Sequence, residues 1–290
     1  MTKLKAAIIG SGKIGTDLLL KILKTDFMKP VVFIGRRIDS EGIQIALGKN
    51  IPISTEGISY LQKNPQNCDI VFDCSNAASA KEHAVTLKQL GIKVIDLTPA
   101  KVGEMCIPCI NGDLLSKTHN VNMITCGGQS SIPMFQLIAA HSQNLQYLEM
   151  VSIVASEGVG MATRENVDEY IQTTEHAIAH FTGVPDTKVM LNVNPAKPCI
   201  NMQTTLFAKA KSFSLQALQQ AIDSRMQKMR QYLPYYELTI PPTLKKGALM
   251  MNIKIRGAGD YLPKYAGNLD IINCSAIEIS KNYYNSLSNK

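Results

Sequence analysis

The stretch KAAIIGSGKIG (Lys5–Gly15) decides how the first part of this chain is interpreted. It opens with a short apolar run typical of a buried strand, and the run stops at glycine. Gly10 to Gly15 then follow the pattern GxGxxG, and apolar residues at helical spacing come next in Asp17–Leu23. Such glycines permit a tight turn and a close approach to a pyrophosphate, whose charge the helix N-terminus favours. The stretch predicts a dinucleotide-binding unit; the alternative is a glycine-rich turn that binds nothing.

The residues that would hold the phosphates share one loop: Gly10, Ser11, Gly12, Lys13, Ile14 and Gly15. A dinucleotide site usually has an acidic residue about 20 positions further on, which binds the ribose 2′-hydroxyl. Here the second β-rich run ends in Arg36 and Arg37 instead, and Asp39 follows. Arginine binds a 2′-phosphate through bidentate hydrogen bonds, so NADP is a second possible cofactor beside NAD. Two solvated arginines on a loop are the alternative.

Outward from this loop, β-rich runs alternate with helical patterns up to about residue 120. The β-rich runs are residues 31–35, 69–73 and 93–97, and a helix is expected over residues 81–90. This alternation predicts a parallel sheet with right-handed crossovers. The chain is therefore expected to be an α/β protein that begins with a Rossmann-type sheet.

The pattern changes after residue 120 to longer strands and longer helices, which suggests a second domain of the α+β class. A helix is expected from Ser130 to His141, with Ser130 or Ser131 as its N-cap and Pro133 in its first turn. Another is expected over residues 164–181, ended by Gly183. The remaining helices are expected over residues 214–232 and 271–284, and strands over residues 147–155, 188–193 and 248–255.

Length and composition exclude several classes of protein. A chain of 290 residues suggests two domains at roughly 150 residues each. With 45% hydrophobic and 18% charged residues, the chain is neither disordered nor collagen-like, and no apolar run is long enough for a membrane-spanning helix. The net charge of +7 is scattered and no Trp is present, so nucleic acid is not an expected partner. The first strand leaves no room for a signal peptide, and seven scattered cysteines indicate reduced thiols in the cytoplasm.

A second motif, TCGGQSS (Thr125–Ser131), places Cys126 just before an expected helix. Unpaired N–H groups there can lower the pKa of a thiol and hold an oxyanion. A thiolate beside a nicotinamide suggests that it attacks an aldehyde, loses hydride from the adduct and retains a thioester. The alternative is a buried structural cysteine. Cys106 with Cys109 and His176 with His180 are weaker signals that lack further ligands, so no metal site is expected.

Several segments together resemble the acylating acetaldehyde dehydrogenases, in order over nearly the whole chain. They are GSGKIGTDL (10–18), VFDCSNA (71–77), IDLTPA (95–100), VNMITCGGQSSIP (121–133), TRENVDEY (163–170), NVNPA (192–196) and YLPKYAGNLDI (261–271). The resemblance implies conversion of acetaldehyde, NAD and coenzyme A to acetyl-CoA in the breakdown of aromatic compounds. It also implies a homodimer, usually in complex with a 4-hydroxy-2-oxovalerate aldolase.

The resemblance also implies roles for matching positions. Cys126 matches the nucleophile, and Asn268 matches an asparagine near the nicotinamide end of the cofactor. A second cofactor-contacting loop matches Ser156, Glu157, Gly158, Val159, Gly160, Met161, Ala162, Thr163 and Arg164. The implied domains are a dinucleotide-binding domain over residues 1–125, with a C-terminal helix over 270–290 packing back on it, and an α+β catalytic and dimerisation domain over 126–269.

The chain departs from the family pattern at three places. Its second loop carries Glu157 for lysine, Met161 for proline and Ala162 for glycine. Gln203 and Thr204 stand where the family usually has Arg-Asp, and Arg37 stands where it usually has aspartate. These differences leave two alternatives open: a divergent enzyme with another acyl group or with NADP, and a non-catalytic cofactor-binding partner of an aldolase.

Overall fold

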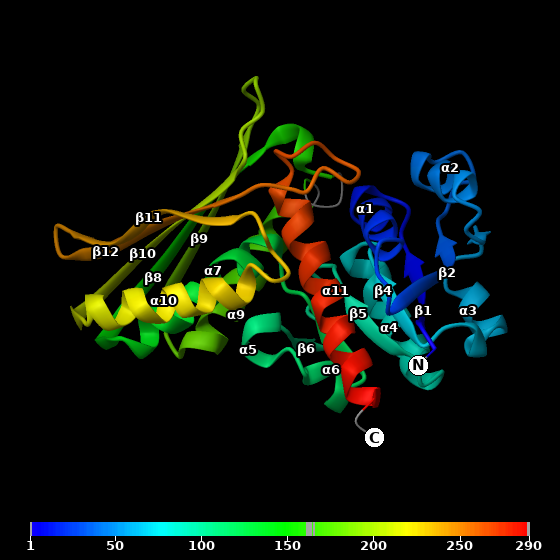
Figure 1. The fold of residues 1–290 in the computed structure, drawn as a ribbon, viewed down its shortest axis with the longest axis horizontal. Coiled ribbons are helices and arrows are strands. Elements are labelled where there is room, and N and C mark those ends of the chain that lie inside the picture. The colour runs from blue at the N-terminus through cyan, green and yellow to red at the C-terminus, as the bar shows by residue number, and fades with distance from the viewer. Residues whose placement is uncertain (1, 161–163, 165, 289–290) are drawn as a thin grey trace. The chain divides into compact units, whose positions relative to one another are not determined.

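A computed structural model describes residues 2–160, 164 and 166–288 (Figure 1). The chain divides into two compact units, which we call unit 1 (residues 1–123 and 272–290) and unit 2 (residues 124–271). Helix α11 (Gly267–Ser288) begins in unit 2 and continues into unit 1.

Unit 1 is built on a parallel sheet with the strand order β3-β2-β1-β4-β5-β7-β6. The strands are β1 (Leu4–Ile9), β2 (Met28–Ile34), β3 (Ile53–Ser54), β4 (Ile70–Asp73), β5 (Lys93–Asp96), β6 (Glu104–Met105) and β7 (Asn120–Asn122). The helices between them are α1 (Lys13–Ile22), α2 (Glu41–Gly48), α3 (Ser59–Lys63), the 3-10 turn η1 (Pro65–Asn67), α4 (Ala77–Gln89), α5 (Pro108–Asn111) and α6 (Leu114–Lys117). The expected Rossmann-type α/β architecture is confirmed.

Apolar residues cover both faces of this sheet, as a parallel sheet with crossover helices requires. Along β1, Ala6 and Ile8 join one buried cluster, whereas Ala7 and Ile9 join another on the opposite face. Ile272, Ala276 and Ile279 of α11 recur at helical spacing and belong to the same cluster as Ala6 and Ile8. The C-terminal helix is therefore part of the core of unit 1.

Unit 2 is a mixed sheet with the strand order β11-β12-β10-β8-β9, and only the β8–β9 pairing is parallel among the described residues. Its elements are α7 (Cys126–Ala140), β8 (Ser142–Ala155), the 3-10 turn η2 (Ser156–Gly158), α9 (Val167–Thr182), β9 (Thr187–Asn194), β10 (Met202–Phe213), α10 (Leu215–Met229), β11 (Tyr236–Lys245) and β12 (Ala248–Ile255). Burial alternates along β8: every second side chain, such as Leu148 and Met150, is fully buried on the face against which α7 packs. We call the opposite face, which carries Glu149, Val151 and Phe207, the open face.

For unit 2, one expectation was wrong and two strands were missed. Helix α7 begins at Cys126 rather than at Ser130, because Thr125 caps it, and Pro133 lies inside the helix instead of in its first turn. Low helix propensity of the two glycines concealed this start. Strands β10 and β11 were not expected from the sequence; β11 contains two prolines and lies at the sheet edge, where proline is tolerated.

Candidate active site

The glycine loop of unit 1 is shaped by close backbone contacts. Gly10 has φ 112°, and a Cβ there would lie 2.4 Å from the carbonyl oxygen of Cys74. A Cβ on Gly15 would lie 1.9 Å from the Gly10 carbonyl oxygen, whereas one on Gly12 would meet nothing within 4 Å. Gly12 is the N-cap of α1 and offers no side chain to the first N–H groups of the helix. This open helix N-terminus fits a pyrophosphate, and Ser11, Lys13 and Ile14 lie in the same segment.

The ends of β2 and of the glycine loop meet beside α2. The Ser11 hydroxyl lies 3.1 Å from that of Ser40, the N-cap of α2. Arg36 and Arg37 are exposed after β2, and Arg37 Nε donates to Asp39 at 3.1 Å. Part of the positive charge expected for a 2′-phosphate is thus neutralised within the loop.

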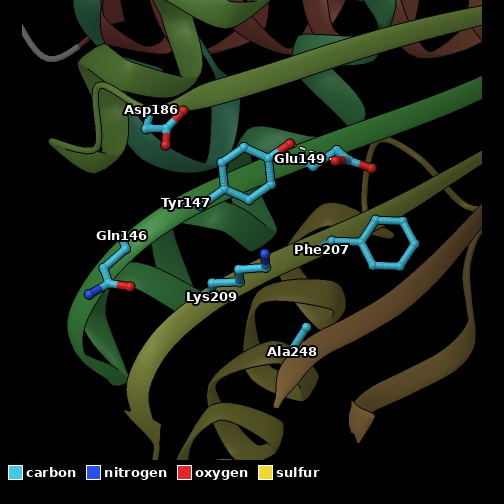
Figure 2. A pocket seen from close by; sticks show the side chains of 7 residues that line it. All are labelled: Gln146, Tyr147, Glu149, Asp186, Phe207, Lys209 and Ala248. Carbon is cyan, nitrogen blue, oxygen red and sulfur yellow. Dashed lines mark hydrogen bonds between the residues drawn. The ribbon is translucent and has the colours of Figure 1, made fainter. Parts of the chain in front are cut away.

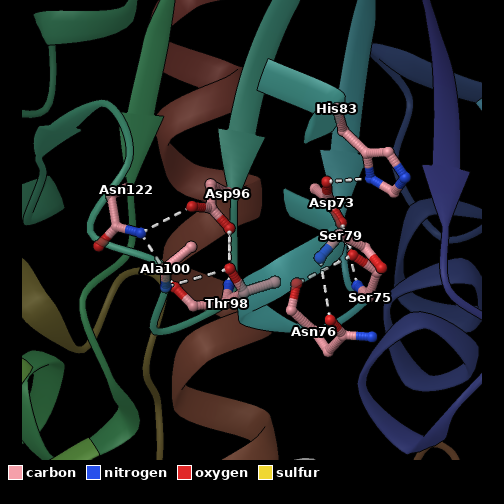
Figure 3. Close-up of polar contacts among 9 residues, drawn as sticks. All are labelled: Asp73, Ser75, Asn76, Ser79, His83, Asp96, Thr98, Ala100 and Asn122. Carbon is pink, nitrogen blue, oxygen red and sulfur yellow. Dashed lines mark hydrogen bonds and ion pairs between the residues drawn. The ribbon is translucent and has the colours of Figure 1, made fainter. Parts of the chain in front are cut away.

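Polar side chains follow the neighbouring strands β4 and β5 where each strand ends (Figure 3). Asp73 Oδ1 accepts from the backbone N–H and hydroxyl of Ser75, and its other oxygen lies 2.7 Å from His83 Nδ1. Asp96 Oδ1 accepts from the N–H and hydroxyl of Thr98. Ligands of parallel α/β sheets bind outside the carboxyl ends of the strands. Each aspartate therefore holds the turn that follows its strand, and the turn after β4 borders the glycine loop, where Cys74 lies against Gly10.

Asp96 is 2% exposed, and its second oxygen accepts from Asn122 at 2.9 Å. Burial raises the pKa of this carboxyl to about 7, helped by the charge of Asp73, although the hydrogen bonds from Thr98 and Asn122 act in the opposite direction.

In unit 2, Cys126 is the first residue of α7. Two residues before it, Ile124 has φ 64°, which is unusual for a β-branched residue and turns the chain toward the helix. Thr125 then caps the helix by accepting from the Gly128 N–H at 2.9 Å. The thiol is consequently placed at the positive end of the helix dipole.

The side chain nearest to the thiol in these contacts is Tyr170 of α9, whose hydroxyl lies 3.6 Å from Cys126 Sγ. Burial raises the pKa of the Cys126 thiol, and the hydrogen bonds with Tyr170 and with the backbone of Gly127 and Cys126 counteract it only in part. First-turn N–H groups can lower the pKa of a thiol, but burial has the larger effect on Cys126.

The second loop and Asn268 come together within unit 2. Asn268 Nδ2 donates to the Gly158 carbonyl at 3.0 Å, and Arg164 donates to the Ser156 carbonyl at 2.7 Å. Glu157 is paired with Lys197 at 2.9 Å. Val159 and Gly160 continue the loop, whereas Met161, Ala162 and Thr163 lie outside the described residues. Among the described residues, no hydrogen bond joins Cys126 to this second loop.

Thr204, which stands at the position of the family's aspartate, is fully buried. Its hydroxyl lies 2.9 Å from that of Ser152 and 3.3 Å from that of Ser130 on α7. Thr204 thus belongs to a cluster of neutral hydroxyls beside this helix.

A shallow pocket lies elsewhere, on the open face of the sheet (Figure 2). Tyr147 donates to Glu149 at 2.6 Å, and Lys209 and Phe207 project beside them. Since Cys126 belongs to the helix that covers the other face, this pocket is not part of the thiol site.

Sequence reasoning missed Tyr170, Asp73 and Asp96. A usable signal existed for the aspartates, because Asp-x-Ser and Asp-x-Thr each follow a buried strand and are typical of side-chain-stabilised turns. Tyr170 offered no such signal, since it lies 44 residues from Cys126.

Comparisons with known protein families agree with this geometry. Residues 5–114 match the NAD-binding domain of the semialdehyde dehydrogenases, and residues 126–263 match the dimerisation domain of prokaryotic acetaldehyde dehydrogenase. A crystal structure of aspartate semialdehyde dehydrogenase with NADP from Candida albicans has a similar fold, with a TM-score of 0.67 and 12% identity over 97% of this chain and 99% of that one. The chain is thus an oxidoreductase that acts on aldehydes with a nicotinamide cofactor.

Relatives over nearly the full length narrow the class further. An acetaldehyde dehydrogenase of Spirochaeta aurantia is 47% identical over 97% of this chain and 94% of its own length. One of Pectobacterium atrosepticum is 45% identical over 96% of this chain and 95% of its own. The chain belongs to the acetaldehyde dehydrogenase family, as the resemblance of its motifs indicated. Within the described residues, every helix is too short or too polar to cross a membrane.

Proposed function

We propose that this protein is an acylating acetaldehyde dehydrogenase, which converts acetaldehyde and coenzyme A to acetyl-CoA with reduction of a nicotinamide cofactor. The observation that carries the proposal is the position of Cys126 as the first residue of a capped helix. A sulfur at this place can become a nucleophile that the first-turn N–H groups stabilise. Motifs of the family surround it in sequence, and the relatives that match are named for the same substrate.

The residues of this chain would act in sequence as follows. Cys126 Sγ loses its proton and attacks the aldehyde carbon, forming a C–S bond, and the aldehyde oxygen becomes the hydroxyl of a thiohemiacetal. The carbon–hydrogen bond of the thiohemiacetal then breaks, its hydride would pass to a bound nicotinamide cofactor, and the hydroxyl releases its proton as the carbonyl re-forms. Cys126 keeps the acetyl group as a thioester until the coenzyme A thiol attacks the carbonyl, the C–S bond to Cys126 breaks and acetyl-CoA leaves.

The decisive experiment follows coenzyme A-dependent reduction of NAD and of NADP by acetaldehyde, with Cys126→Ser alongside. We expect acyl transfer to be lost in the variant, because a serine hydroxyl is far less acidic than a thiol, while cofactor binding persists. Undiminished turnover in Cys126→Ser would contradict the thioester route. Wild-type activity that prefers a longer or different aldehyde would favour the divergent enzyme among the alternatives.

The cofactor preference depends on the loop after β2. Arg36 is exposed, whereas Arg37 is paired with Asp39. We propose NAD as the cofactor, with NADP as a second possibility. The KM values for NAD and NADP in the variants Arg36→Ala and Asp39→Ala distinguish the two cofactors. If a 2′-phosphate binds here, Arg36→Ala raises KM for NADP about tenfold and leaves KM for NAD unchanged, as loss of a charged hydrogen bond implies.

The partners proposed for the enzyme are a second copy of itself and a 4-hydroxy-2-oxovalerate aldolase, in the breakdown of aromatic compounds. The match of residues 126–263 to a dimerisation domain supports a homodimer. We place the protein in the cytoplasm, where its seven cysteines, which form no disulfide in the structure, remain reduced. A non-catalytic partner of the aldolase is the competing function; an acetyl group found on Cys126 by mass spectrometry after incubation with acetyl-CoA would contradict it.

A further inference from the structure

We propose that Tyr170 is a catalytic residue of this enzyme, whose phenol donates a hydrogen bond to the Cys126 thiolate before attack and again when the sulfur leaves the acyl group. The proposal rests on the proposed function, since it requires Cys126 to be the nucleophile.

The phenol of Tyr170 lies next to the nucleophile. The Tyr170 oxygen lies 3.6 Å from Cys126 Sγ, within hydrogen-bond reach for sulfur, and the side chain is 5% exposed. A Cβ at position 127 would lie 2.2 Å from the same oxygen, so the phenol can approach the sulfur because residue 127 is glycine. The contact therefore depends on the residue next to the nucleophile.

The tyrosine is also held in place. Thr174, one helical turn further along α9, donates to the Tyr170 carbonyl at 2.7 Å, and its hydroxyl lies 2.7 Å from that of Thr125. Thr125 is the N-cap of α7. A chain of short contacts thus joins α9 to the turn that carries the nucleophile, and the phenol is positioned by two packed helices rather than by a loop.

The phenol is the donor in this pair when Cys126 is ionised. Burial and the negative charge of Cys126 raise the pKa of Tyr170, so it keeps its proton when the thiolate forms. A phenol that keeps its proton has it available for the sulfur 3.6 Å away.

On α7, β8 and β10, the described side chains packed around the start of α7 are neutral. Helix α7 carries no titratable side chain besides Cys126 itself. Toward this helix, β8 presents Met150 and Ser152, and β10 presents Thr204. Among the described residues, the side chain that lowers the pKa of the Cys126 thiol is Tyr170. Burial of the sulfur makes its thiolate costly to form, so a neutral hydrogen-bond donor at this place has a large effect.

In each step the phenol keeps its proton. When the thiol ionises, its proton passes to solvent and the phenol O–H points to the sulfur. When coenzyme A attacks the thioester, the C–S bond to Cys126 breaks, the electron pair returns to Sγ, and the phenol again donates to it; the coenzyme A proton passes to solvent. Tyr170 therefore acts as a hydrogen-bond donor and not as a general base.

The test measures the thiol pKa of Cys126 in the full chain, from the pH dependence of iodoacetamide alkylation followed on the Cys126 peptide by mass spectrometry. Tyr170→Phe should raise this pKa by about one unit, so that alkylation at neutral pH slows about tenfold, as loss of one hydrogen bond to a charged group implies. The matched control is Tyr236→Phe, because Tyr236 is also buried in unit 2 and donates to the Ser130 carbonyl of α7 at 2.7 Å. It should lower the melting temperature and leave the thiol pKa unchanged.

Gly127→Ala supplies an independent test, since the new Cβ must displace the phenol from the sulfur. It should shift the thiol pKa in the same direction, and it keeps the proposal falsifiable if Tyr170→Phe does not fold. An unchanged thiol pKa in the folded variants would overturn the role of Tyr170, even if acetyl-Cys126 forms normally in the wild type. Failure of the wild type to form acetyl-Cys126 would instead overturn the proposed function, and the alkylation data would still decide the contact.

Discussion

At the scale of single residues, burial sets the chemistry of this protein more than sequence neighbours do. Cys126 lies at a helix N-terminus, yet burial raises the pKa of its thiol. Asp96 is surrounded by hydrogen-bond donors, yet burial and the charge of Asp73 raise the pKa of its carboxyl to about 7. In both cases desolvation of a charge outweighs the groups that favour it.

Asp96 leads to a prediction about stability and pH. Because its pKa is about 7 in the folded chain and about 4 in an unfolded one, the folded state holds a proton that the unfolded state releases between these values. Its contribution to stability is full below about pH 4 and is lost as the pH rises through about 7. Urea unfolding of the wild type between pH 5 and 8 should therefore show falling stability, and Asp96→Asn should flatten this dependence.

Asp26→Asn is a suitable control for that measurement, because Asp26 is an exposed carboxylate of the same unit. It should leave the slope of stability against pH as in the wild type. Equal slopes in the wild type and in Asp96→Asn would show that Asp96 does not hold the proton.

At the scale of elements, the start of α1 depends on glycines that have different tasks. Gly15 lets the helix approach the Gly10 carbonyl, where no Cβ has room. Gly12 instead faces open space at the helix N-terminus, where a pyrophosphate would need close backbone approach. Alanine is compatible with the backbone at Gly12, whose φ is −80°.

Substitutions can test the roles of these two glycines separately. Gly15→Ala should lower the melting temperature and remove NADH binding together, because the loop must deform. Gly12→Ala should fold with an unchanged melting temperature and lose NADH affinity, since its methyl group would occupy the phosphate position. Thermal melting and fluorescence titration with NADH measure both effects; full NADH affinity in Gly12→Ala would exclude the loop as the phosphate site.

At the scale of the whole molecule, unit 2 covers one face of its sheet with its own helices, and we propose that the open face binds a second copy. The half-buried Val151, Ile153 and Phe207 lie there beside Glu149 and Lys209. A two-fold axis can bring such an acid opposite such a base, and apolar residues between them suit a self-complementary interface. The match of this region to a dimerisation domain supports the same occupant.

This surface predicts the effect of one substitution on assembly. Phe207→Glu places a charge in the centre of the open face and should convert the dimer to a monomer in sedimentation velocity experiments. Val85→Glu is the control, because Val85 is 61% exposed in unit 1. A dimer that persists in Phe207→Glu would assign the interface to another surface.

The sequence by itself determined the features that rest on local chemistry. The glycine loop after β1, the buried strands at 69–73 and 93–97, and the end of α9 at Gly183, whose φ is 73°, follow from residue types at fixed spacing. The start of α7 and strands β10 and β11 did not, because a cap that depends on Thr125 and strands stabilised by their neighbours are decided by packing.

Only the tertiary structure decided what surrounds the reactive groups. Tyr170 of α9 contacts Cys126 of α7, and Asp73 lies beside Asp96 at the carboxyl ends of two neighbouring strands. Thr204 lies between the hydroxyls of two serines. Local patterns name the residue types that can perform chemistry. Their pKa values and partners depend on desolvation and on contacts between residues far apart in the chain, which exist only when the fold has formed.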